Sequence, residues 1–227
     1  MNRNIGKVLF QFEKTALLIV FMILLINISV NGLVVVLDDS ITVNFFTVQT
    51  LLYIVLFSFV YLIIYAINQV VTAIPFLVSL NCPKKNLARK IIFNGFVRSF
   101  VMSLIIVAVK LIIVSSDLWL TTSIFGINIT SGNIGTTVLL AGIFYLLLIS
   151  VYSFLTFISL LGVKFGWEYV VTTAFIILGL CFLLVKSLVL LVVFGWQINV
   201  FIIGLLFIIA VFNFINYKLI KSFEYKN

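Results

Sequence analysis

The chain has 227 residues, of which 64% are hydrophobic and 9% charged. A water-soluble domain cannot cover that much apolar surface with polar side chains, so the composition excludes an ordinary soluble protein and predicts one embedded in lipid. The net charge of +8 matches the excess of Lys and Arg that membrane proteins carry in cytoplasmic loops, and we expect no nucleic-acid partner.

The apolar residues form six long runs separated by short polar breaks. A bilayer core of about 30 Å needs roughly 20 apolar residues per helix. The predicted fold class is therefore all-α: a single polytopic membrane domain over residues 1–227 with six transmembrane helices. The spans are predicted at about 16–37, 45–72, 96–116, 138–161, 169–190 and 198–217.

The N-terminal segment precedes the first span. Apolar residues recur at helical spacing between residues 2 and 14, and three basic residues lie elsewhere around the same helix. This pattern predicts an interfacial amphipathic helix on the membrane surface. The alternative is a frayed basic tail.

Two breaks between spans have distinct signals. Pro75 is expected to end or kink the second helix, because proline lacks a backbone donor. Residues 117–136 are polar and rich in Gly, Asn, Ser and Thr, which predicts an external loop.

The most polar part of the chain is predicted to be a cytoplasmic coupling loop over 81–95. Asn81 is a cap-forming residue close to Pro83, and both suit the start of a helix. We therefore predict a short helix over 83–93, which residues 94–95, Asn and Gly, interrupt.

This short helix is predicted to present a basic side and an apolar side. Leu87 and Ile91 are spaced by four and share one face. Such a surface could insert between the lobes of a cytoplasmic partner, or it could be only a basic loop that fixes topology. The basic residues are Lys84, Lys85, Arg89 and Lys90.

The distribution of positive charge predicts the orientation. With both termini in the cytoplasm, every Lys and Arg except Lys110 and Lys186 falls on the inner side. Those two lie near the outer ends of spans and can snorkel to the interface. The prediction is a multi-pass protein of the cell membrane.

No catalytic machinery is recognisable in the sequence. The chain has no histidine, which excludes imidazole bases and histidine metal triads, and it has no Gly-rich loop of the P-loop type. The six carboxylates are scattered, and Cys82 and Cys181 have no disulfide or zinc spacing. We expect no enzymatic activity and no cofactor.

Several amides fall within or beside the predicted spans. They could line a translocation path, or they could serve as hydrogen-bonding glue between helices. Both readings stay open from the sequence. The path candidates are Asn27, Asn31, Asn68, Gln69 and Asn213, with Asn216 close by.

The chain resembles the six-helix permeases of the ABC-2 type, which belong to ATP-driven exporters. That family has a pattern of Pro-Phe, a few apolar residues, a basic pair, and later a Phe and a Gly. The matching residues are Ile74, Pro75, Phe76, Leu77, Val78, Ser79, Leu80, Lys84, Lys85, Ile92, Phe93, Asn94 and Gly95, and the turn Lys164, Phe165, Gly166 is similar to the family's basic-Phe-Gly turn.

The resemblance implies a mechanism divided between chains. A separate cytoplasmic ABC ATPase would hydrolyse ATP, and the helix around 83–93 would couple its closure to a tilt of the spans. A second permease copy, or a related permease, would complete the path. The implied cargo is an amphipathic or antimicrobial peptide, as in the exporters of phenol-soluble modulins.

Two other classes of function stay open. A membrane-embedded binding subunit of an energy-coupling importer also has about six helices and a separate ATPase. A non-transport scaffold or immunity protein needs only lipid-facing helices. A lipid-modifying enzyme is disfavoured, because it would need clustered acidic residues.

Overall fold

In the computed structural model, the described residues are 43–114, 123–124, 127–128, 134–166, 168 and 198–222, with the single positions 14, 18 and 22. The predicted interfacial helix, the first span and the fifth span lie outside these residues, apart from those single positions. The described elements are α2 (Val43–Asn68), the π-helix η1 (Gln69–Ala73), α3 (Ile74–Ser79), α4 (Lys84–Val114), β1 (Ser123–Ile124), β2 (Ile127–Asn128), α5 (Ile134–Phe165) and α7 (Ile198–Lys221).

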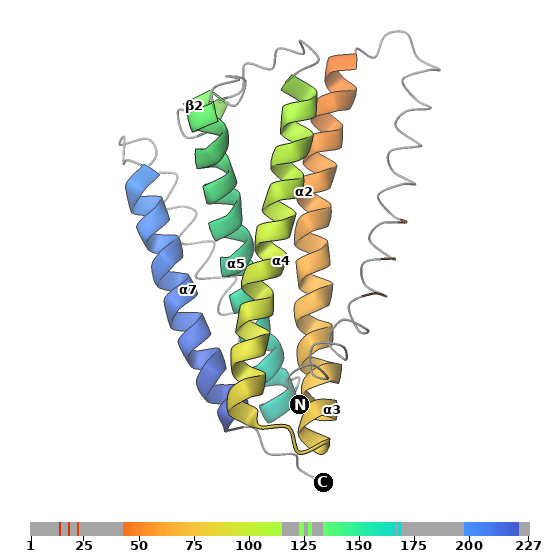
Figure 1. The fold of residues 1–227 in the computed structure, drawn as a ribbon, viewed down its shortest axis with the longest axis vertical. Helices are drawn as coiled ribbons and strands as arrows, with labels where there is room; N and C mark the ends of the chain where they lie inside the picture. Colours follow the sequence, from red (N-terminus) through yellow and green to blue (C-terminus); the bar gives the residue numbers. More distant parts are fainter. Residues whose placement is uncertain are drawn as a thin grey trace.

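The described helices run roughly along one axis (Figure 1). Helices α2, α5 and α7 run from the upper end of the view to the lower end, and α4 runs in the opposite direction. Helix α5 is central, because it packs against α2, α4 and α7. At the upper end, β1 and β2 form a short antiparallel pair in which Ser123 is opposite Asn128.

Four helical segments are long and apolar enough to cross a membrane, which confirms four of the predicted spans at this level. Large apolar side chains such as Phe207 and Phe93 are exposed. Several small polar residues are buried instead, as in helix packing within lipid. The four segments are Ile54–Ser79, Lys84–Ala108, Thr137–Phe165 and Ile202–Lys221.

The second helix does not end at Pro75, contrary to one form of the prediction. The chain stays helical through the π-helix η1 and through α3, and this helical stretch ends at Ser79. The N–H of Ile74 donates to the carbonyl of Gln69, a bond across five residues. This wider turn directly precedes Pro75, whose ring would clash with the carbonyl four residues back in a regular α-helix.

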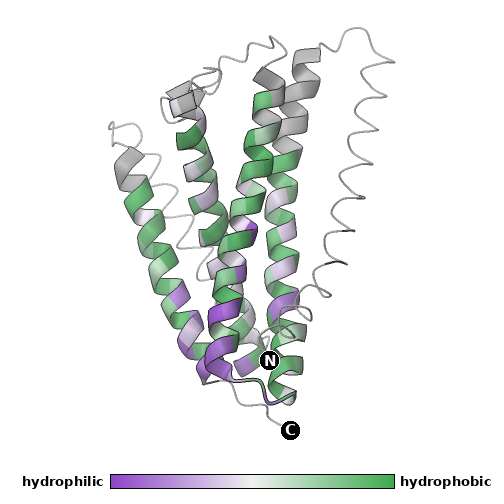
Figure 2. Ribbon diagram, in the orientation of Figure 1, coloured by the Kyte–Doolittle hydropathy of each residue, from purple (hydrophilic) through white to green (hydrophobic). Residues whose placement is uncertain are grey.

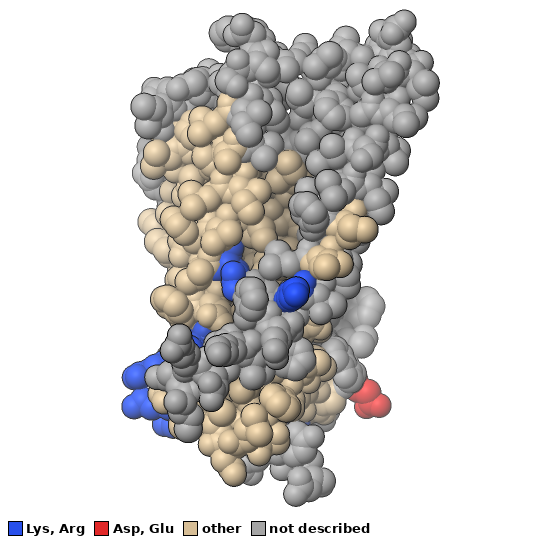
Figure 3. All heavy atoms as spheres, turned by 45° about the vertical axis from the view of Figure 1, so that its right-hand side comes forward, with Lys and Arg blue, Asp and Glu red and all other residues tan. Residues whose placement is uncertain are grey.

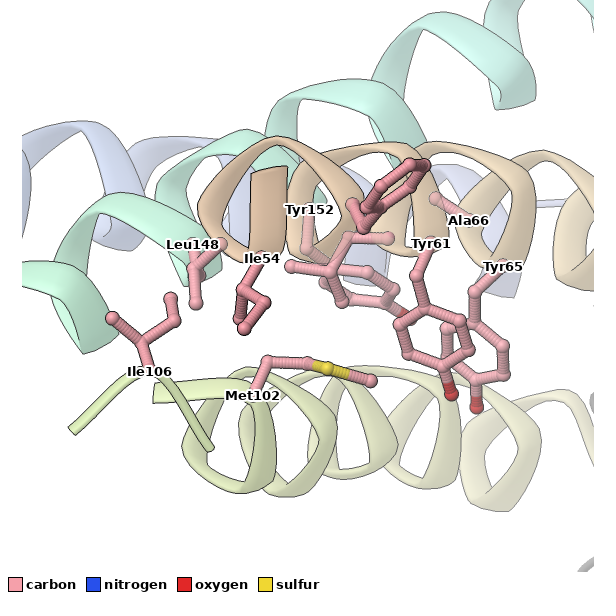
Figure 4. Close-up of a cluster of buried hydrophobic side chains, with 10 residues drawn as sticks. Ile54, Tyr61, Tyr65, Ala66, Met102, Ile106, Leu148 and Tyr152 are labelled. Carbon is pink, nitrogen blue, oxygen red and sulfur yellow. The ribbon is translucent and has the colours of Figure 1, made fainter. Parts of the chain in front are cut away.

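Two apolar clusters hold the helices together. The central cluster joins α2, α4 and α5, and Figure 4 shows Met102 and Ile106 of α4 facing side chains of the other two helices. The lower cluster joins η1, α3 and the lower ends of α4, α5 and α7. The central cluster is Ile54, Phe57, Tyr61, Leu62, Tyr65, Ala66, Met102, Ile106, Leu148 and Tyr152; the lower cluster is Val70, Ala73, Ile74, Leu77, Leu87, Ala88, Ile91, Leu160 and Ile220.

Candidate functional site

A tight turn positions the basic start of α4. Asn81 has φ 54°, in the left-handed region. The N–H of Cys82 donates to the carbonyl of Leu77 at 3.1 Å, and the N–H of Asn81 donates to that of Val78 at 3.0 Å. This pair of bonds is a Schellman motif. Asn81 therefore ends α3 and does not cap the next helix as predicted, and α4 begins just after Pro83.

The predicted coupling helix is the first part of α4, and no break separates the two. Helix α4 runs without interruption from Lys84 to Val114, through residues 94–95. The prediction of a separate short helix over 83–93 is wrong. The lower cluster and the packing of Gly95 stabilise the helical conformation there, which outweighs the weak helix propensity of Asn and Gly.

The apolar face of this segment points into the protein. Leu87 and Ile91 are both 0% exposed and pack in the lower cluster. They are therefore not placed to insert into a partner, contrary to the predicted role. The basic residues lie on the other faces: Lys85 and Arg89 are exposed, and Lys84 and Lys90 are half-buried.

Gly95 brings α4 against the ring of Tyr152 on α5. A Cβ atom built on Gly95 would lie 1.9 Å from Cε1 of Tyr152, far inside van der Waals contact. Only glycine allows this approach. Gly95 was predicted to help interrupt the helix. It is instead the described glycine at which α4 comes closest to α5.

The hydroxyl of Tyr152 links three helical segments. It lies 2.5 Å from Oε1 of Gln69 in η1 and 3.0 Å from the carbonyl oxygen of Ile91 in α4, and it is the donor in both contacts. One phenolic proton cannot serve two acceptors fully. With the Gln69 amide turned by 180°, its Nε2, otherwise buried without a partner, donates to the phenol while the phenol donates to Ile91.

A second polar contact joins α5 and α7. Nδ2 of Asn216 donates to the backbone carbonyl of Ser153 at 2.8 Å, and Oγ of Ser153 donates to Oδ1 of Asn213 at 3.3 Å. Gln69 and Asn216 are buried, whereas Asn68 and Asn213 are half-buried. These bonds are the contacts expected of interhelical glue.

The predicted translocation path stays a prediction. Asn27 and Asn31 lie outside the described residues. Gln69 and Asn213 belong to two separate hydrogen-bonded groups, one around Tyr152 and one around Ser153. The bonds tie neighbouring helices together.

The lower end of the described bundle is strongly basic. Figures 2 and 3 show hydrophilic and basic residues gathered in its lower half. They come from the start of α4 and from the last turns of α5 and α7. Within the described part of the chain, Glu168 is the one acidic residue. The basic residues at this end are Lys84, Lys85, Arg89, Lys90, Lys164, Lys218 and Lys221.

Tyr152 and Ser153 were not among the predicted site residues, although α5 carried a usable signal. Small hydroxyl residues recur every three positions along this helix, at 150, 153, 156 and 159, so the row winds around the helix, and all four are buried. Such a row marks a helix–helix interface in membranes. Tyr152 precedes Ser153 in the sequence, and its longer side chain carries a hydroxyl that reaches Gln69 and Ile91.

The described residues contain no group of three or more His, Cys, Asp or Glu that could hold a metal ion. Comparisons of the chain with models of known families, with curated proteins and with solved structures find no match.

Proposed function

We propose that the protein is the membrane-spanning permease subunit of an ATP-driven exporter, energised by a separate cytoplasmic ABC ATPase. The observation that carries the proposal is the form of α4. Its exposed basic residues Lys85 and Arg89 stand at one end of a single helix that continues for 31 residues. A partner that binds this basic end and moves it can therefore tilt a helix that is long enough to span the membrane.

The packing of α4 supports its role in transmitting force. Leu87 and Ile91 are fixed in the lower cluster, and Gly95 lies against Tyr152 two turns from Leu87. Tyr152 in turn is bonded to Gln69 and to the backbone of α4. A tilt imposed at the start of α4 is therefore shared with η1 and α5, because close-packed contacts transmit displacement.

In the proposed topology the protein passes the cell membrane six times, with both termini in the cytoplasm. The gathering of basic side chains at one end of the described helices supports this orientation. The parallel direction of α5 and α7 supports a further span between them. A second permease copy, or a related one, completes the path.

The proposed cargo is an amphipathic or antimicrobial peptide. It rests on the resemblance of residues 74–95 and 164–166 to ABC-2 type permeases. Fold-level likeness does not identify a substrate, so the assembly with the ATPase is tested first.

Copurification tests the assembly. The full chain is coexpressed with the soluble P-loop ATPases of its genome, and the bound subunit is identified. We expect one ATPase to copurify, and Lys85→Ser with Arg89→Ser to release it. Lys218→Ser with Lys221→Ser removes the same amount of charge from the same end of the bundle, and this variant should still bind the ATPase.

A folded protein that holds no ATPase would contradict the proposal. If that protein also retained a vitamin, it would favour the binding subunit of an importer. Release of the ATPase by both double substitutions would mean that net charge, and not the start of α4, makes the contact.

A further inference from the structure

The lower end of α7 contains an open pocket of about 500 Å³. Its lining combines two apolar and three polar residues. Ile215 and Leu219 are four residues apart and form one side, and Lys218 and Ser222 are four apart and form the next. Lys221 completes the pocket.

A third ammonium group stands at this pocket. Nζ of Lys164, in the last turn of α5, donates to Oγ of Ser222 at 2.9 Å. Nζ of Lys218 lies 4.6 Å from the centre of the Phe214 ring, a cation–π contact that holds the ammonium group beside apolar surface. Lys164, Lys218 and Lys221 therefore bring three positive charges around Ser222.

An exposed apolar stripe leads along α7 to Lys218. Ile203, Phe207, Val211 and Phe214 follow one another at helical spacing, and all are exposed. Figure 2 shows that α7 is hydrophobic in its middle and hydrophilic toward its lower end, where the lysines lie. It offers a surface for a hydrocarbon chain whose polar end reaches the lysines.

We propose that this pocket and stripe bind one anionic phospholipid. The headgroup phosphate lies among Lys164, Lys218 and Lys221, and an acyl chain lies along the stripe that ends at Phe214. Charge complementarity selects an anionic headgroup. The apolar wall of Ile215 and Leu219 favours a lipid over a free phosphate ion.

Lipid titration of the purified full chain tests this site, with bound phosphatidylglycerol counted by native mass spectrometry. Each Lys near an anionic surface is worth about fivefold in affinity. Lys218→Ser with Lys221→Ser should therefore weaken binding about 25-fold. Lys85→Ser with Arg89→Ser, which removes equal charge from α4, should change it less than about twofold.

Two further arms identify the ligand. Phosphatidylcholine should bind about tenfold more weakly than phosphatidylglycerol, and excess inorganic phosphate should leave the bound lipid in place. If both double substitutions weaken lipid binding equally, or if neither weakens it, the proposed site is wrong. Equal binding of the two lipids would overturn the role of charge, and displacement by phosphate would overturn the lipid as occupant.

This site does not depend on the proposed transport function. The lipid measurement needs no ATPase, and a lost ATPase interaction leaves its outcome unchanged. All the substituted side chains are exposed, and an unchanged helical circular dichroism spectrum checks that each variant folds.

Discussion

Gly95 and Tyr152 are in such close contact that no other residue fits at position 95. A Cβ on Gly95 would lie 1.9, 2.3 and 2.6 Å from three carbon atoms of the Tyr152 ring. The same ring carries the hydroxyl that bonds to Gln69 and to the carbonyl of Ile91. This one residue, Tyr152, therefore joins α4, α5 and η1.

Gly95→Ala is expected to destabilise the protein by about 1–3 kcal/mol, the usual cost of overpacking. Unfolding in SDS titrations measures the change. Gly142→Ala is the matched control, because it is also helical but has nothing within 4 Å of the built Cβ. That control should be neutral or slightly stabilising, since alanine favours a helix over glycine by about 1 kcal/mol. Equal effects at both positions would contradict the close contact.

Tyr152→Phe removes the hydroxyl and keeps the ring. We expect a loss of about 1 kcal/mol, because the amide of Gln69 is left buried without this partner. A double-mutant cycle with Gln69→Leu isolates the interaction. The double variant should be less destabilised than the sum of the single variants, and strict additivity would mean that the two groups do not interact.

Asn216→Leu tests whether Asn216 on α7 holds two helices together or lines a translocation path. If its bond to the Ser153 carbonyl is glue, the substitution lowers stability by about 0.6–1.7 kcal/mol. Ile203→Leu, on the exposed side of the same helix, should have no effect. Unchanged stability of Asn216→Leu combined with altered peptide selectivity in transport would instead place Asn216 in a path.

The apolar runs were sufficient to predict four helices. The local signals between the runs were not sufficient to predict where each helix begins and ends. Pro75 was expected to end or kink a helix. The helix does not end there, because a π-helical turn directly before Pro75 is followed by helix to Ser79. Breaker residues identify a local weakness in a helix. They do not tell whether packing elsewhere compensates for it.

The coupling segment illustrates the same limit for an amphipathic pattern. Leu87 and Ile91 at a spacing of four correctly identified an apolar face, but the pattern could not tell whether that face meets a partner or the protein itself. Burial of both residues in the lower cluster answers this. Gly95 and Tyr152 are 57 positions apart in the sequence, so no local pattern could have paired them.

ATP-driven peptide uptake by inverted membrane vesicles that contain the protein and its copurified ATPase is the sharpest test of the proposed export function. A fluorescent amphipathic peptide supplied outside should accumulate inside only with ATP, and Lys85→Ser with Arg89→Ser should abolish uptake while the protein stays in the membrane. Uptake that is indifferent to ATP, or the same in vesicles without this protein, would contradict the proposal that it is an exporter permease.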